Sequence, residues 1–145
     1  MPIDCKSVKS FFLDLLFPKF CINCQKEESY LCEDCFALID FLPPRSYKLG
    51  SIDVFSAVPY NNFIIKKLIR QFKYEPYIKE LAKTLAFLII HHLSQIGREF
   101  ELKLSNSNEK VIIPIPLSKK RFRERGYNQS EELAKELSVF LKIPL

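Results

Sequence analysis

The sequence contains no apolar run long enough to cross a membrane. Its longest one, Leu85 to Ile90, is far shorter than the ~20 residues that a spanning helix needs. Near the N-terminus, Asp14 interrupts the apolar stretch that follows Lys6 and Lys9, and no small-residue cleavage site comes after it, so we expect no signal peptide. Repeats and low-complexity tracts are also missing. We therefore expect a cytoplasmic protein without a transmembrane segment, whose thiols stay reduced.

The composition is that of a small folded protein. The 145 residues are 48% hydrophobic and 27% charged, which supports one domain with a core plus an appendage. The net charge of +5 is compatible with nucleic acid or phosphate ligands but does not demonstrate them.

Four of the five cysteines form a C-x2-C-x7-C-x2-C pattern, namely Cys21, Cys24, Cys32 and Cys35. Each C-x2-C pair can turn tightly and aim two thiolates at one point, so two pairs complete a tetrahedral site. The pattern predicts a structural zinc ion, with no chemistry at the metal because no coordination position is open. An iron–sulfur cluster, a redox dithiol and disulfides are the alternatives. The fifth, Cys5, lies outside the pattern.

Helices and a strand are predicted around this motif. Residues 5–17 carry a helical apolar stripe that ends at Pro18, and residues 40–51 form a connector rich in turn residues. Residues 52–60 predict a strand. Asn61 and Asn62 can cap a following helix, and a longer helix is predicted from about residue 75 to 98. We therefore expect an N-terminal helix and zinc knuckle in residues 1–50, and an α/β domain in residues 51–145.

The segment from Val111 to Ala134 reads as strand, basic loop and helix. Val111 to Ile113 is short and apolar, as in a buried strand, and Gly126 allows a turn with positive φ. Asn128 predicts a helix N-cap, with Glu131 three residues later as in a capping box. A loop between a strand and a helix N-terminus is where α/β proteins bind ligands. The cations of this loop, Lys119, Lys120, Arg121, Arg123 and Arg125, favour an anion there. A solvated basic loop is the alternative.

A second group of cations lies on the predicted helix after Asn62. Lys66, Lys67, Arg70 and Lys73 alternate there with apolar residues. A core stripe opposite a solvated face explains this pattern, and contact with nucleic acid is the alternative. If the basic residues contact nucleic acid, the binding residues would be Lys66, Lys67, Arg70, Lys73, Lys119, Lys120 and Arg123.

The run PIPLSKKRFRERGYNQSEELA resembles the signature of the ComF family of phosphoribosyltransferase-like proteins. That signature has a Pro-Val-Pro-Leu run, then Arg-x-Arg-Gly-Phe-Asn-Gln and Leu-Ala, and the residues that match it here are Pro114, Pro116, Leu117, Arg121, Arg125, Gly126, Asn128, Gln129, Leu133 and Ala134. Leu16-Phe17-Pro18 followed by Cys21 and Cys24 also resembles the family.

This resemblance implies the first half of a type I phosphoribosyltransferase-like domain and a role in DNA uptake during natural transformation. By resemblance, the pyrophosphate or anion would be held by Leu117, Ser118, Arg121, Arg125, Gly126, Asn128 and Gln129. A complete protein of this type would bind magnesium with phosphoribosyl pyrophosphate (PRPP). Its partners would be single-stranded DNA and competence proteins of the helicase type.

The family's later PRPP-binding loop, two adjacent acidic residues followed by Thr-Thr-Gly, does not occur in this sequence. We therefore expect a truncated member that is inactive by itself, although its class as an enzyme stays open. Two functions remain: a phosphoribosyltransferase-type enzyme, or a non-catalytic zinc-containing module that binds single-stranded DNA or competence proteins.

Overall fold

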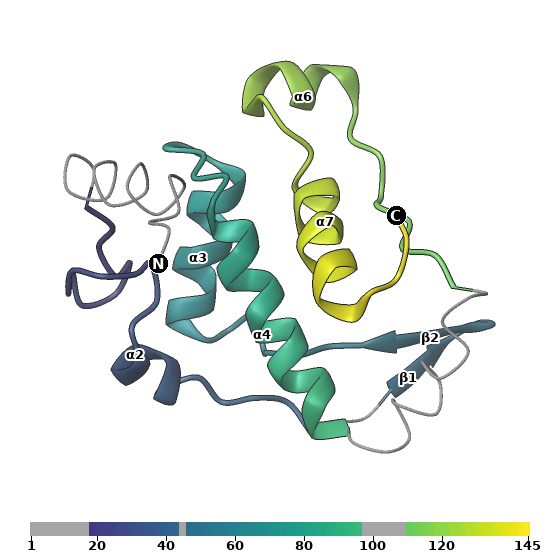
Figure 1. Cartoon of the computed structure of the whole chain (residues 1–145), viewed down its shortest axis with the longest axis horizontal. Helices are drawn as coiled ribbons and strands as arrows, with labels where there is room; N and C mark the ends of the chain where they lie inside the picture. Colours follow the sequence, from purple (N-terminus) through teal and green to yellow (C-terminus); the bar gives the residue numbers. More distant parts are fainter. Residues whose placement is uncertain (1–17, 44–45, 97–109) are drawn as a thin grey trace, which may run out of the picture. The chain divides into compact units, whose positions relative to one another are not determined.

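The computed structural model describes residues 18–43, 46–96 and 110–145, and these fall into two compact units, one ending at Leu38 and the other beginning at Ile39 (Figure 1). The helix predicted for residues 5–17, with Cys5, lies outside the described residues. The sequence had placed the boundary at residue 50, inside the second unit.

The first unit is built around its cysteines. An isolated antiparallel bridge joins Phe20 to Glu27, and the short helix α2, Glu33–Ala37, begins after Cys32. The turn between Phe20 and Glu27 is closed by hydrogen bonds from Cys21 N to Lys26 O at 2.8 Å and from Gln25 N to Cys21 O at 2.9 Å. The three sulfur-bearing side chains of Cys21, Cys32 and Cys35 are buried at the centre.

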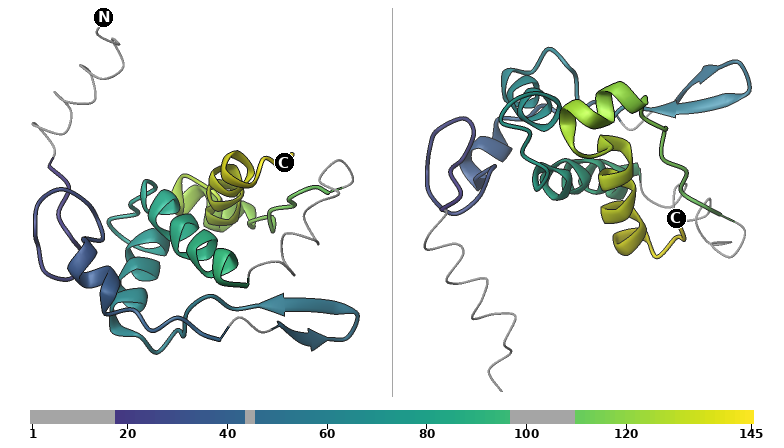
Figure 2. Two further views of the ribbon diagram at one scale, coloured as in Figure 1. Left: turned by 60° about the horizontal axis from the view of Figure 1, so that its bottom comes forward. Right: turned by 90° about the horizontal axis from the view of Figure 1, so that it is seen from above.

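In the described part of the second unit there are four helices and one hairpin. The helices are α3 (Phe63–Lys73), α4 (Leu81–Ile96), α6 (Lys119–Arg125) and α7 (Gln129–Leu141). The strands β1 (Ser46–Leu49) and β2 (Ile52–Phe55) pair antiparallel and extend away from the helices (Figure 2). Helix α4 packs against both α7 and α3 and so forms the centre of this unit.

Helix α3 is amphipathic, as its sequence predicts. The Asn62 side chain accepts hydrogen bonds from the backbone N–H groups of Ile64 and Ile65, at 3.0 and 3.2 Å, which confirms the predicted N-cap. The buried side of the helix carries Ile64, Ile65, Leu68 and Phe72, whereas Lys66, Arg70 and Lys73 are exposed.

Helix α4 buries Leu81, Leu85 and Leu88 on one face. His92 continues this face and is only 1% exposed, and both its ring nitrogens lack a hydrogen-bond partner. Burial, followed by the charge of His91, lowers the His92 pKa below its ordinary value, so the ring is neutral at physiological pH.

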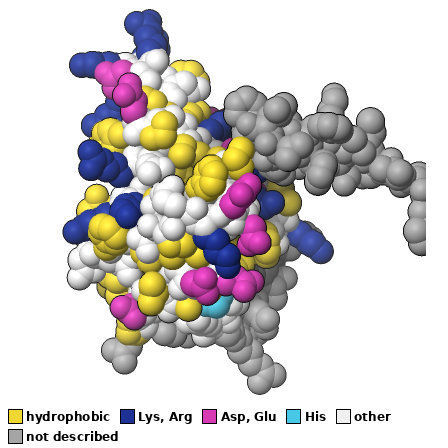
Figure 3. All heavy atoms as spheres, turned by 90° about the vertical axis from the view of Figure 1, so that its left-hand side faces the viewer, with side chains coloured by type: hydrophobic (Ala, Val, Ile, Leu, Met, Phe, Trp, Pro, Cys, Tyr) yellow, Lys and Arg dark blue, Asp and Glu magenta, His cyan; other side chains and the backbone are white. Residues whose placement is uncertain are grey.

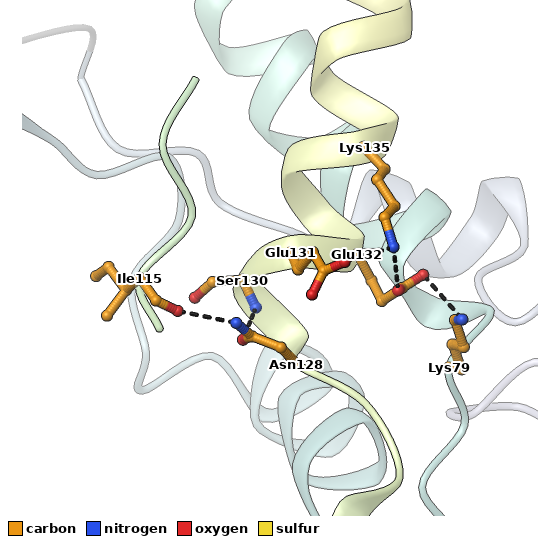
Figure 4. Close-up of polar contacts among 7 residues, drawn as sticks. All are labelled: Lys79, Ile115, Asn128, Ser130, Glu131, Glu132 and Lys135. Carbon is orange, nitrogen blue, oxygen red and sulfur yellow. Dashed lines mark hydrogen bonds and ion pairs between the residues drawn. The ribbon is translucent and has the colours of Figure 1, made fainter. Parts of the chain in front are cut away.

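The start of α7 is tied to the segment before α4 by charge. The Glu132 carboxylate lies 3.2 Å from Lys79 Nζ and 3.0 Å from Lys135 Nζ, and Lys135 also reaches Glu131 at 2.8 Å (Figure 4). Burial raises the pKa of Glu132, but hydrogen bonds and charge from Lys135 and Lys79 outweigh it and lower the pKa below the ordinary value. The carboxylate therefore stays ionised and links two elements distant in sequence.

Several predicted elements differ from the structure. The apolar run Val111–Ile113 is not a buried strand: Val111 and Ile113 are 57% and 78% exposed, and the run pairs with no described strand. Pro114 and Pro116 lack the N–H groups that a ladder needs, and Ile112 N bonds instead to Pro144 O at 2.8 Å.

The other differences concern element bounds and type. The strand predicted to reach residue 60 ends at Phe55, the predicted connector contains β1, and the helix predicted from residue 75 begins at Leu81. Among the described residues, the two-stranded antiparallel sheet is the only one, so the arrangement is mixed and mostly helical, and no parallel α/β sheet is seen there.

Candidate metal centre and basic surface

The four cysteines of the repeated C-x2-C motif meet at one point. Their sulfur atoms all lie within 4.8 Å of one another, and Cys24 Sγ lies 3.5 Å from Cys32 Sγ. A tetrahedral zinc site with Zn–S bonds of about 2.3 Å has sulfur–sulfur edges of about 3.8 Å. The donor set and its spacing therefore fit a thiophilic divalent metal such as zinc, as the spacing in the sequence predicts.

All four cysteines are present as free thiols rather than disulfides. Cys21, Cys32 and Cys35 are buried and Cys24 is exposed. The Asn23 side-chain amide donates to Cys35 Sγ at 3.4 Å, an interaction that the motif alone does not reveal. Such a contact orients the sulfur from outside the ligand set, as partners of metal ligands commonly do.

The backbone prepares one cysteine to be a thiolate. Burial raises the pKa of the Cys21 thiol, but the backbone N–H groups of Cys24, Cys32 and Asn23 outweigh burial and lower this pKa to about 6. For Cys35 the amide of Asn23 lowers the pKa, yet burial and the neighbouring sulfurs together raise it to about 12. A bound dication would therefore displace protons from the remaining thiols.

The predicted basic loop is in fact a helix. Ser118 accepts a hydrogen bond from Arg121 N at 3.4 Å and caps α6, and Gly126, with a φ of 75°, ends it. Lys, Arg and Glu are good helix formers, and a capping serine before them and a glycine after them explain why the segment is helical. No residue of α6 is buried, and the side chains of Lys119, Lys120, Arg121 and Arg123 are exposed.

The residues predicted to hold an anion are used largely in contacts within the fold. Asn128 Nδ2 donates to Ile115 O at 3.1 Å, while Asn128 Oδ1 accepts from Ser130 N at 3.1 Å (Figure 4). Arg125 Nη1 donates to Gln129 Oε1 at 2.9 Å, and Gln129 Nε2 donates to Phe72 O at 3.4 Å.

Of the same predicted set, Ser118 caps α6, Gly126 forms its end, Leu117 is half-buried and Arg121 is exposed. The structure thus brings Asn128, Gln129 and Arg125 together, but leaves the Arg121 side chain facing solvent.

A contact between α6 and the end of α3 joins the two groups of cations. The guanidinium of Arg125 lies over the exposed ring of Tyr74, 5.5 Å from its centroid, and Tyr74 follows Lys73 directly. In Figure 3, Lys and Arg side chains lie at the top of the view and down its left edge, and α6 lies at the top in Figure 1. The exposed members of both groups are Lys66, Arg70, Lys73, Lys119, Lys120, Arg121 and Arg123.

Lys67 is placed differently from the other cations of α3. Its Nζ lies 4.1 Å from the centroid of the Phe63 ring, and its side chain is half-buried. Phe63 itself is exposed, so a flat apolar surface lies beside the cations of α3.

Tyr127 was not singled out from the sequence, although it holds this region together. Its hydroxyl donates to Phe72 O at 2.5 Å, and its ring packs against the Phe72 ring with centroids 5.6 Å apart. A residue just before an N-cap often packs against the helix that follows it, but Tyr127 packs on Phe72 of the earlier helix α3.

Among the described helices, none is both long and apolar enough to cross a membrane. No protein-family model matches the chain, and no solved structure matches it either. The chain is a distant homologue of a curated protein, the competence protein F of Haemophilus influenzae. The two are 30% identical over 139 residues, which are 96% of this chain and 52% of the relative. This homology confirms the resemblance predicted from the basic segment and the cysteines. The chain spans about half the length of that relative.

Proposed function

We propose that this chain acts in natural transformation, in the handling of incoming DNA, as a ComF-type phosphoribosyltransferase-like protein. The observation that carries the proposal is its similarity to competence protein F over 96% of its residues, from the cysteine motif to α7. A role in the cytoplasm is proposed with it, since all four clustered thiols are free.

The cysteine cluster is proposed to hold one structural zinc ion. Between residues 18 and 38 the only buried apolar side chains are Cys21, Ile22, Cys32 and Cys35, so metal binding would supply much of the folding free energy of this segment, on the order of 10 kcal/mol for sites of this kind. Four thiolates leave no open coordination position for a substrate or water. The metal therefore serves folding and not chemistry.

Within this process, binding of single-stranded DNA is favoured over catalysis by a specific contact. Arg125 over Tyr74 places the end of α6 beside the end of α3, next to an exposed aromatic ring. Cations that follow a phosphate backbone, interspersed with aromatic rings on which bases stack, are typical of sequence-tolerant single-strand binding. A helicase-type competence protein is proposed as the partner that delivers or accepts the strand.

The enzymatic alternative requires free polar groups around a pyrophosphate. Asn128 and Gln129 instead bond to the carbonyl oxygens of Ile115 and Phe72, and Arg125 bonds to Gln129. The exposed Arg121 and the Leu117-Ser118 turn could still contact a pyrophosphate. No residue identified in this sequence would hold the ribose hydroxyls or the 5-phosphate of PRPP.

The test is the salt dependence of binding to a fluorescent single-stranded oligonucleotide. We expect an affinity that falls steeply with salt, and a slope of log affinity against log salt that decreases by about 0.7 for each phosphate contact removed. Arg121→Ala with Arg123→Ala should reduce both affinity and slope. Lys48→Ala with Lys83→Ala is the matched control, because both lysines are exposed and lie outside α3 and α6.

An affinity that stays flat between low and moderate salt would refute the DNA-binding role, as would equal effects of the two double variants. The wider role is tested in a transformable host that depends on this gene. There, the Arg121→Ala, Arg123→Ala chain should fail to restore transformation, whereas the control chain should restore it.

A further inference from the structure

Cys24 differs from the other three cysteines of the cluster in being exposed. Cys21, Cys32 and Cys35 are 0%, 4% and 3% exposed, so Cys24 is the residue of the cluster that solvent reaches. Reactivity of a thiol toward oxidants depends on access as well as on thiolate character. The cluster thus has one exposed cysteine and three buried ones.

Cys24 also interacts with the sulfurs of Cys21 and Cys35, but its contact with Cys32 crosses from one C-x2-C pair to the other. Cys24 Sγ lies 3.5 Å from Cys32 Sγ, while Cys35 Sγ accepts a hydrogen bond from Asn23 Nδ2. A bond between Cys24 and Cys32 needs the two sulfurs to approach by less than 2 Å, to the usual S–S length of about 2.05 Å. It would join residues on either side of the 25–31 turn.

We propose that Cys24 is a modification site for small peroxide oxidants, and that its oxidation closes a Cys24–Cys32 disulfide that opens the metal site. The site follows from exposure and from the sulfur–sulfur contact. The release of a metal ion, but not the disulfide itself, rests on the zinc site proposed above.

The chemistry needs one peroxide and two protons. The Cys24 thiolate attacks one peroxide oxygen, the O–O bond breaks and hydroxide leaves, so that Cys24 becomes a sulfenic acid. The Cys32 thiolate then attacks the Cys24 sulfur, the S–S bond forms, and the S–O bond breaks with loss of a second hydroxide. Solvent protons convert both hydroxides to water, the two sulfurs together lose two electrons, and the peroxide gains them.

Such a disulfide removes two of the four ligands at once, one from each pair. A metal held by the two remaining sulfurs has lost its closed tetrahedral shell. Because folding of the first unit is coupled to the metal, oxidation would loosen this unit, and reduction by a dithiol would restore it. The cluster would then sense peroxide as well as stabilise the first unit.

The experiment uses the full chain with Cys5→Ser, so that the four clustered cysteines are the only thiols. The zinc-loaded protein is treated with hydrogen peroxide, free thiols are blocked with N-ethylmaleimide, and disulfides are located by peptide mass spectrometry. A chromogenic chelator follows zinc release. We expect a Cys24–Cys32 disulfide, one zinc released for each disulfide formed, and recovery after dithiothreitol.

Two variants sharpen the test. Cys24→Ser should form no disulfide at low peroxide, whereas Cys35→Ser, which also removes one ligand, should still form the Cys24–Cys32 bond. If either variant does not fold, the peptide map of the parent chain decides alone. A Cys21–Cys24 or Cys32–Cys35 disulfide forming first, or zinc loss without a disulfide, would overturn the assignment.

The outcomes also separate this inference from the proposed zinc site. A chain that binds no zinc but forms the Cys24–Cys32 disulfide refutes structural zinc and supports the modification site. A zinc-loaded chain in which another cysteine is oxidised first supports the metal site and refutes the role of Cys24.

Discussion

The hydroxyl of Tyr127 donates a hydrogen bond to the carbonyl oxygen of Phe72, a residue 55 positions earlier in the chain. Phe72 lies in the last turn of α3, where helix carbonyls have no partner inside the helix. Tyr127 supplies that partner, and its position next to Asn128 places the start of α7 against α3. The contact therefore orients the segment that resembles the ComF signature.

Tyr127→Phe is expected to lower the free energy of unfolding by about 1 kcal/mol, because a buried hydrogen bond is lost while the ring packing is kept. Burial raises the pKa of Tyr127 above its ordinary value, so the phenol remains a donor throughout the neutral range. Urea denaturation measures the change. Tyr47→Phe is the control, since Tyr47 is exposed and its hydroxyl has no comparable burial; equal effects of the two substitutions would contradict the role of Tyr127.

One zinc ion is expected to purify with each chain and to be lost as the pH falls. Protons compete with the metal for the thiolates, so apparent affinity should decrease toward acid and most strongly below the Cys21 pKa of about 6. Elemental analysis gives the stoichiometry, and a chelator titration at several pH values gives the trend. Iron in place of zinc, or affinity that does not change with pH, would exclude this site as described.

Glu132→Gln is expected to reduce stability at neutral pH by about 1 kcal/mol. This is a modest value because Lys79 and Lys135 are half-exposed and the ion pairs are screened by solvent.

The pKa of Glu132 determines how the stability difference between the two chains changes with pH. The folded-state pKa of Glu132 lies below its ordinary value of 4.5, so its contribution is complete above that value and is lost as the pH falls through the lower folded-state pKa. The difference between the parent chain and Glu132→Gln should therefore vanish in acid, as measured by urea denaturation along a pH series. Glu136→Gln serves as control, and a difference independent of pH would argue against the ion pairs.

This chain by itself is expected to transfer no phosphoribosyl group. Misplacement of reacting groups by about 1 Å can cost on the order of 100-fold in rate, and nothing identified in this sequence would position the ribose of PRPP. Incubation with PRPP, magnesium and a panel of bases, with pyrophosphate release as the readout, tests this. Turnover that is lost in Arg125→Ala would mean that residues assigned here to structure form a ribose site.

Local patterns were enough to predict several parts of this molecule. The cysteine spacing determined the four-sulfur cluster, because each C-x2-C pair is confined to one turn and only two pairs had to meet. Asn62 and Asn128 marked helix starts correctly, since capping depends on backbone groups within about four residues. The homology to competence protein F was likewise visible in the segment around Arg125.

Only the tertiary structure decided which partners the polar side chains of that segment would have. The family resemblance implies ligand-binding roles for Asn128 and Gln129, yet their amides bond to Ile115 O and Phe72 O, 13 and 57 positions away. Likewise, Val111–Ile113 has the composition of a buried strand but remains exposed, because a strand requires a neighbour to pair with its backbone groups. Helix caps and metal knuckles are closed by neighbouring residues, whereas sheet pairing and side-chain partners depend on segments that only folding brings together.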